Sequence, residues 1–251
     1  MRRNERITTI TIAVAGVQSR IGTTTQAMQI VGYLKIMGYT VAYVDLTEKL
    51  YLEQIQKLYK GVSIKEGGKG ILYNDIEMYS SISELKGETY DFLVKDYGNM
   101  KENFNRVSYL EQDIQIICCG AKPNEMFEIA ESLKQEELKA AHYIFSFVPP
   151  DQKAGIVEAM GSRKERTYFA AYNPDPFVYD AAMNKCYRHL IGDYLSYASV
   201  SGGRRRNAGF SLNFIKRAMK WIKEMIKGPG KAVLILGYTI LLSVIWITVL
   251  T

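Results

Sequence analysis

The sequence predicts an α/β protein: a three-layer sandwich in which helices cover both faces of a mainly parallel sheet. Through residues 7–197, apolar and β-branched runs alternate with helix-like segments, an order that parallel strands with right-handed crossovers require. The 251 residues are 47% hydrophobic and 23% charged, which supplies enough apolar material for a core and excludes an intrinsically disordered chain.

The expected elements follow one another in a simple order. Short apolar runs predict strands at 7–14, 40–44, 92–95, 114–119, 143–147 and 167–171. Apolar residues at three- and four-residue steps predict helices at 24–37, 50–57, 103–110, 124–139, 151–160 and 178–197. Residues 73–83 are compatible with either a short strand or a hairpin.

The net charge of +6 is distributed unevenly. Residues 204–231 contain nine Lys or Arg and one Glu, a sum of +8, which leaves −2 for residues 1–203. The excess of positive charge therefore belongs to the C-terminal segment and gives no argument for nucleic-acid binding by the whole chain.

The last twenty residues, 232–251, contain no charge, and as a helix they would span about 30 Å, the hydrocarbon thickness of a bilayer. The alternative is a buried core helix. Residues 211–227 predict a basic amphipathic helix on an anionic inner leaflet or against a partner's helix. We therefore expect a domain over 1–200, a basic linker and amphipathic helix over 201–230, and a transmembrane tail anchor over 231–251. The preceding cations predict a single-pass protein of the cytoplasmic membrane with its N-terminal domain in the cytoplasm.

Three loops are expected at the carboxyl ends of neighbouring strands, where parallel sheets bind their ligands. The first is a glycine-bearing loop between a strand and a helix, which directs backbone N–H groups towards an anion. The other two contain Asp45 and Asp96. The candidate ligand-binding residues of the first loop are Gly16, Ser19, Arg20, Ile21, Gly22, Thr23, Thr24 and Thr25. Together these loops predict a nucleotide–Mg²⁺ site, although the two carboxylates are also compatible with simple capping of their loops.

Four separated motifs resemble, in the same order, the MinD/ParA group of P-loop proteins. They are GTTTQA at 22–27, VAYVD at 41–45, YDFLVKDYG at 90–98 and YNPDPF at 172–177. The resemblance extends over about residues 7–197 and implies a P-loop-type sandwich that binds ATP and Mg²⁺.

The same resemblance implies roles for individual residues. Asp45 corresponds to a carboxylate near the attacking water, and Asp96 to the Walker B or switch II position, so both are candidate catalytic residues. Asn173 and Pro174 fall in a loop that often lies near the adenine. Thr24 and Asp96 are the candidate Mg²⁺ ligands.

The first loop departs from the P-loop pattern GxxxxGK[ST]. Gly16 and Gly22 are separated by five residues, and Thr23 occupies the place of the lysine. The family's second, signature lysine is also absent from residues 17–19, which leaves Arg20 as the only cation of the loop. Because both lysines are absent, much of the positive charge that stabilises phosphoryl transfer is lost, and the sequence does not decide whether the protein hydrolyses ATP.

These observations predict a membrane-anchored localisation or assembly scaffold for a bacterial membrane machine, similar to the Tad-pilus localisation proteins of the same superfamily. Its expected partners are anionic lipid, proteins of that machine and a second copy of the chain. One alternative is a working Mg²⁺-dependent ATPase in which Arg20 or a partner's residue supplies the missing charge. Another is nucleic-acid binding by the basic tail, which the apolar stripe of residues 212–226 disfavours.

Overall fold

The computed structural model describes residues 9–47, 51–65, 67 and 69–201. All of them belong to one of the two units into which the chain divides, Met1–Arg205. The expected amphipathic helix at 211–227 and the expected span at 232–251 lie outside the described residues.

Within these described ranges, no helix combines the length and the apolar character needed to cross a membrane. The longest of them, α6 (Asn184–Ser201), contains Lys185, Arg188 and Asp193, which a lipid environment accepts only at high cost. This finding contradicts the expected localisation as a single-pass protein of the cytoplasmic membrane, and we do not retain it.

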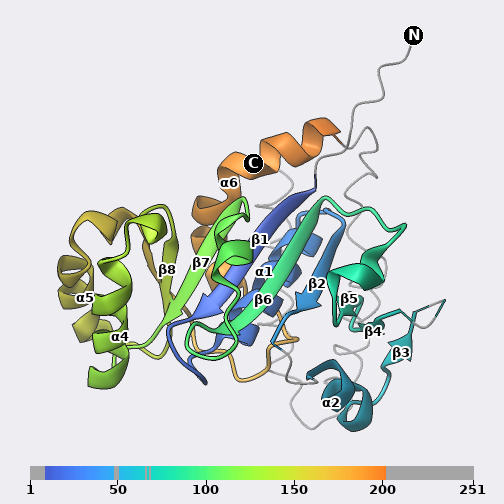
Figure 1. The fold of residues 1–251 in the computed structure, drawn as a ribbon, viewed down its shortest axis with the longest axis horizontal. Coiled ribbons are helices and arrows are strands. Elements are labelled where there is room, and N and C mark those ends of the chain that lie inside the picture. Colours follow the sequence, from blue (N-terminus) through green and yellow to red (C-terminus); the bar gives the residue numbers. More distant parts are fainter. Residues whose placement is uncertain (1–8, 48–50, 66, 68, 202–251) are drawn as a thin grey trace, which may run out of the picture. The chain divides into compact units, whose positions relative to one another are not determined.

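A nine-stranded sheet forms the centre of the described unit (Figure 1). Its strands are β1 (Ile10–Gly16), β2 (Val41–Asp45), β3 (Ser63–Ile64), β4 (Ile71–Tyr73), β5 (Ile76–Tyr79), β6 (Phe92–Asn99), β7 (Ile114–Cys119), β8 (His142–Phe145) and β9 (Thr167–Phe169). They are arranged in the order β3-β4-β5-β2-β6-β1-β7-β8-β9. Neighbouring strands are parallel except in the pairs β3–β4 and β4–β5. The predicted α/β class with a mainly parallel sheet is confirmed.

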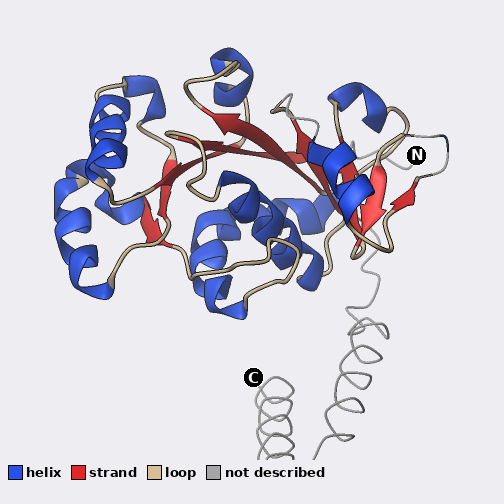
Figure 2. Cartoon of the chain, turned by 90° about the horizontal axis from the view of Figure 1, so that it is seen from below, coloured by secondary structure: helices blue, strands red, loops and turns tan. Residues whose placement is uncertain are grey.

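Helices lie on both faces of the sheet, which Figure 2 shows nearly edge-on. In addition to α6 they are α1 (Thr23–Ile36), α2 (Tyr51–Leu58), α3 (Arg106–Leu110), α4 (Pro123–Leu133) and α5 (Lys153–Ala159). The hydroxyl of Tyr187 in α6 donates to Oε1 of Gln26 in α1 at 2.8 Å, so these two helices lie side by side. Strand β1 lies in the interior of the sheet and is buried at every residue except Thr11, which explains its largely apolar sequence.

The segment expected as a short strand or a hairpin at 73–83 is part of a hairpin that extends over residues 71–79. Tyr73 of β4 pairs with Ile76 of β5 across a two-residue turn. Both turn residues, Asn74 and Asp75, have positive φ angles of 50° and 63°, which is the conformation of a type I′ turn. This hairpin adds the antiparallel edge that strand–helix alternation did not predict.

Four expected helices are shorter than predicted. The segment 103–110 is helical only over Arg106–Leu110, and 151–160 only over Lys153–Ala159. The segment 124–139 is interrupted after Leu133 and continues as a 3₁₀ turn at Glu136–Leu138. The last helix begins at Asn184 instead of residue 178, because the side chain of Asp180 accepts a hydrogen bond from the N–H of Ala182 and starts a separate 3₁₀ turn. The residues released from the helix belong to a loop that reaches the site described below.

Candidate functional site

The loop between β1 and α1 has the backbone geometry of an anion-binding loop. Arg20 and Gly22 have positive φ angles of 64° and 91°, and no side chain in the described part of the chain caps the N-terminus of α1. The N–H groups of residues 23–25 therefore have no intrahelical partner and lie at the positive end of the helix dipole. Gly16 is needed for this packing, since a Cβ atom there would lie 2.4 Å from Oγ1 of Thr23.

A cavity of about 890 Å³ adjoins this loop. Eight of the expected site residues line it: Ser19, Arg20, Gly22, Thr23, Thr24, Thr25, Asn173 and Pro174. The glycine loop and the loop at 172–174, which are far apart in the sequence, thus meet at one cavity.

Four expected site residues do not line this cavity. Gly16 lies beneath the loop, the Ile21 side chain is buried in the core, and Asp96 is buried below the cavity. Asp45 lines a different hollow of about 490 Å³, together with Glu53 and Glu84 among others.

The carboxylate of Asp45 is bound within its own loop. Its Oδ1 accepts hydrogen bonds from the N–H and the hydroxyl of Thr47, at 2.9 and 2.6 Å. Thr47, two residues further on, is the residue that lines the large cavity. An Asp followed two residues later by Thr at the end of a strand is typical of a local side-chain turn, and this signal in the sequence was overlooked.

Asp96 lies inside β6 rather than after its end, and it is fully buried. Its Oδ2 accepts hydrogen bonds from the hydroxyls of Thr24 at 2.7 Å and Tyr43 at 3.0 Å, and its Oδ1 accepts one from the N–H of Gly98 at 2.9 Å. Burial raises the pKa of the Asp96 carboxyl above its ordinary value, and the three donors oppose this shift.

The Thr24–Asp96 pair is chemically suited to Mg²⁺. Because Thr24 donates its only hydroxyl proton to Asp96, the lone pairs of its oxygen are left for a cation. Among the described residues no group of three or more His, Cys, Asp or Glu could hold a metal ion. A metal here would therefore be completed by phosphates and water, which is how proteins commonly bind Mg²⁺.

Few charged side chains line the cavity. Of the described residues that line it, Arg20 is the cation and Glu102 the anion. The guanidinium of Arg20 is exposed and makes no hydrogen bond or ion pair with any other described residue. It is therefore free to contact an anionic ligand. Thr23, at the expected place of the lysine, has its hydroxyl against Gly16.

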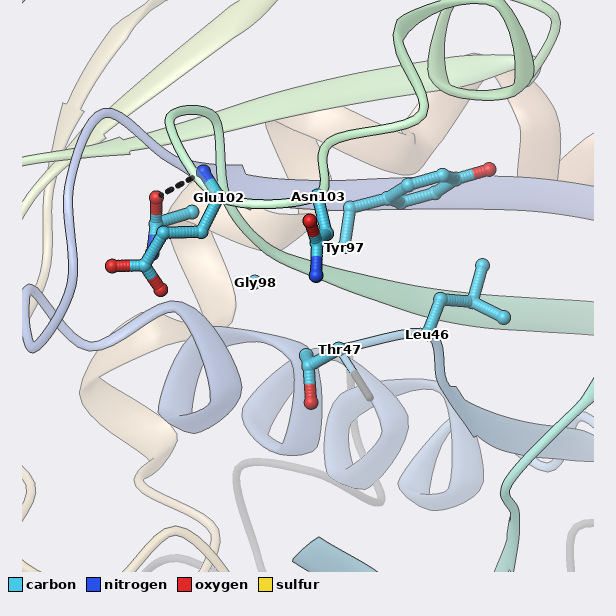
Figure 3. A pocket seen from close by; sticks show the side chains of 7 residues that line it. Leu46, Thr47, Tyr97, Gly98, Glu102 and Asn103 are labelled. Carbon is cyan, nitrogen blue, oxygen red and sulfur yellow. Dashed lines mark hydrogen bonds between the residues drawn. The ribbon is translucent and has the colours of Figure 1, made fainter. Parts of the chain in front are cut away.

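A smaller cavity of about 160 Å³ shares Thr47, Gly98, Asn99 and Glu102 with the larger one. Figure 3 shows Leu46 and Thr47 across this space from Tyr97, Glu102 and Asn103.

The loop that follows β6 is fixed by Asn99. The side-chain oxygen of Asn99 accepts hydrogen bonds from the N–H groups of Lys101 and Glu102, at 2.9 and 3.0 Å. Its amide donates to Oγ of Ser19 at 2.8 Å. Asn99 therefore holds this loop against the glycine loop, a role that the sequence analysis missed.

Two aromatic side chains line the cavity near Asn173 and Pro174. Phe147 and Tyr172 are 63% and 73% exposed, and their ring centroids are 6.1 Å apart. Phe147 has a φ of 59°, a left-handed conformation that is rare for a bulky residue. An exposed aromatic pair held in this way is a surface on which a planar ring can stack. Their proximity depends on the strand order, which the sequence did not reveal.

Gln29 of α1 positions the loop that contains Asn173. Its amide donates to the carbonyl oxygens of Pro176 and Val178 at 3.0 and 2.8 Å, and its Oε1 accepts from the N–H of Asp180 at 2.8 Å. The helix that begins at the glycine loop therefore also holds the opposite side of the cavity.

Comparisons with known proteins give a similarity of fold. No protein-family model and no curated protein matches the chain. A putative plasmid partition protein from Borrelia burgdorferi B31, bound to AMPPNP, has a TM-score of 0.47 and 15% identity, with 75% of this chain and 98% of that chain covered. The MinC:MinD cell division protein complex of Aquifex aeolicus gives a TM-score of 0.46 and 12% identity, covering 78% and 96%.

A third similar structure is pNOB8 ParA bound to nonspecific DNA, with a TM-score of 0.45, 10% identity and coverage of 76% and 97%. These proteins are of the ParA/MinD type. At TM-scores below 0.5 and identities of at most 15%, they do not by themselves assign a family or a function to this chain.

Proposed function

We propose that this protein binds ATP together with Mg²⁺ in the cavity beside the glycine loop. The main supporting observation is that the uncapped N-terminus of α1 and the exposed pair Phe147–Tyr172 line the same cavity of about 890 Å³. Phosphates would bind the N–H groups at the start of α1, and the Thr24 hydroxyl would bind the metal. The base would stack on the aromatic pair, beside Asn173 and Pro174.

We further propose that this divergent site binds nucleotide without efficient hydrolysis, so that the protein acts as a nucleotide-dependent localisation or assembly scaffold. Two observations support a weak catalyst: Arg20 is the only cation among the described lining residues, and the Asp45 carboxylate lies at another hollow. Its partners would be proteins, including a second copy of the chain. Nucleic acid is a less suitable partner for the domain that holds the cavity, because residues 1–203 have a net charge of −2.

A second candidate function is a working Mg²⁺-dependent ATPase. The observation that favours it is the presence of one cation and one carboxylate, Arg20 and Glu102, on the same cavity. Arg20 would neutralise charge on the phosphates, and Glu102 would orient a water molecule.

Calorimetric titration of ATP and Mg²⁺ into the full-length chain tests the binding proposal. The site variant is Gly16→Ala, whose new Cβ would collide with Thr23. The matched control is Gly192→Ala in α6, where a Cβ meets no atom within 4 Å. We expect binding by the wild type and by the control, and its loss in Gly16→Ala. Absence of heat with the wild type up to millimolar ATP would refute the proposal.

If binding is found, release of inorganic phosphate separates the two candidates. The scaffold proposal predicts no turnover above the buffer rate. Sustained turnover that is lost in Glu102→Gln, with affinity retained, would favour the ATPase instead.

A further inference from the structure

Tyr43 is linked through Asp96 to Thr24, the proposed Mg²⁺ ligand. It is the central residue of β2, it is fully buried, and its hydroxyl donates to Oδ2 of Asp96 at 3.0 Å. The same carboxylate oxygen accepts the hydroxyl proton of Thr24 at 2.7 Å. Thr24 in turn lines the large cavity. Three side chains from β2, β6 and α1 thus form one short chain of hydrogen bonds that ends at the cavity.

The hydroxyl of a buried tyrosine needs a partner, because leaving it without one costs the full desolvation of the polar group. Val41, Ala42 and Val44 around it in β2 are apolar, so a phenylalanine would suit this position if packing alone mattered. The hydroxyl of Tyr43 is therefore the polar feature of the strand that needs an explanation.

The two oxygens of Asp96 are held from different sides. The N–H of Gly98 fixes Oδ1, and the Tyr43 hydroxyl fixes Oδ2 next to Thr24. With the carboxylate fixed in this orientation, Thr24 directs its single proton at Asp96 and its lone pairs elsewhere. If the carboxylate were free to turn, the Thr24 proton could point into the cavity, and a donor at that place would oppose a cation.

We propose that Tyr43 is a positioning residue for Mg²⁺. By holding Oδ2 of Asp96 it keeps the Thr24 oxygen available as a metal ligand, in the way that groups behind a metal ligand orient it elsewhere. The inference rests on the proposed nucleotide function. It gives β2 a role at the site through Tyr43, whereas the expected site residue of that strand, Asp45, lines a different hollow.

The test uses Tyr43→Phe and a matched control, Tyr187→Phe, in the full-length chain. Tyr187 is also fully buried, and its hydroxyl also donates to a side chain, Oε1 of Gln26, at 2.8 Å. Both variants keep the ring and lose one buried hydroxyl. The measured quantity is the ratio of ATP affinity with Mg²⁺ to ATP affinity in EDTA, which reports the coupling of metal to nucleotide.

We expect Tyr43→Phe to lower this ratio by about tenfold while the affinity in EDTA stays that of the wild type. Tyr187→Phe should leave both values unchanged. Thermal unfolding without ligand measures the structural cost of each lost hydroxyl, which we expect to be larger for Tyr43→Phe because its acceptor is a carboxylate and that of Tyr187 is a neutral amide. This combination separates metal positioning from a purely structural contribution.

Other results would overturn the inference in distinguishable ways. An unchanged ratio in Tyr43→Phe removes the role of Tyr43 and leaves nucleotide binding intact. An equal fall of both affinities, or the same fall in Tyr187→Phe, assigns the hydroxyl to stability alone. Failure of the wild type to bind ATP removes the proposed function together with this inference.

Discussion

Asp45 and Asp96 occupy equivalent backbone positions, but their carboxylates bind different partners. They are register partners on the parallel strands β2 and β6, and each accepts a hydrogen bond from the backbone N–H two residues further on. Asp45 completes its contacts with the nearby Thr47, whereas Asp96 binds Thr24 and Tyr43 from other parts of the sequence.

Strand register alone does not decide which carboxylate lies next to the cavity. Strand register places the Cα atoms of the two Asp residues side by side. The direction of each carboxylate depends on the hydroxyl groups that it can reach, Thr47 for Asp45 and Thr24 and Tyr43 for Asp96. Asp45 is bound locally and lines a separate hollow, while Asp96 links two strands and the helix that begins at the glycine loop. Long-range anchoring should therefore contribute more to stability and to ligand binding than local anchoring does.

Removal of the Asp96 carboxylate should destabilise the protein more than removal of the Asp45 carboxylate or of any other contact considered below. Asp96→Ala leaves the hydroxyls of Tyr43 and Thr24 and the N–H of Gly98 without their acceptor, and we expect a loss of about 3 kcal/mol in unfolding free energy. Asp45→Ala removes a local turn contact and should cost about 1 kcal/mol. Urea unfolding of both variants measures the difference. Equal losses would contradict the distinction between long-range and local anchoring.

A second long-range anchor gives a somewhat smaller effect. Gln29→Leu removes three hydrogen bonds from α1 to residues 176–180, and we expect about 2 kcal/mol of destabilisation. The loop with Asn173 should loosen, so ATP affinity should fall as well.

Gln115→Leu is a matched control for the Gln29 variant. The amide of Gln115 bonds only to the nearby carbonyls of Leu110 and Gln112, and these atoms lie away from the cavity. We expect a smaller loss of stability and unchanged ATP affinity, measured by urea unfolding and calorimetry. If Gln115→Leu weakened ATP binding as much as Gln29→Leu, the loop would not be held through Gln29.

Much of the fold was predictable because its signals are local. The apolar run of β1 predicted the ends of that strand to within three residues, and the glycine before α1 predicted the helix start to within one residue. The sequence did not distinguish the hairpin at 71–79 from a single strand, because its strands are only three and four residues long, too short for a clear alternation of apolar and polar residues.

The site was predictable only in part, because it depends on strand order and on side-chain partners. The glycine loop and Asn173 were found from their motifs, and they do meet. Phe147 and Tyr172 were missed, since they become neighbours only when β8 and β9 pair in parallel. Tyr43 was interpreted as part of an apolar strand, and nothing within that strand indicated that its hydroxyl binds a carboxylate 53 residues further along the chain.

The smallest expected effect is a pH dependence that belongs to Asp96. Because its pKa is raised in the folded state, the folded protein binds more protons than the unfolded chain at pH values just above the ordinary pKa of an Asp. Its stabilising contribution is therefore present at low pH and declines as pH rises from about 4 through the raised pKa. Asp96→Asn should remove this decline, and Asp45→Asn, the register partner, should keep it. Urea unfolding of the three proteins between about pH 4 and 7 measures the slopes, and an unchanged slope in Asp96→Asn would assign the decline to another group.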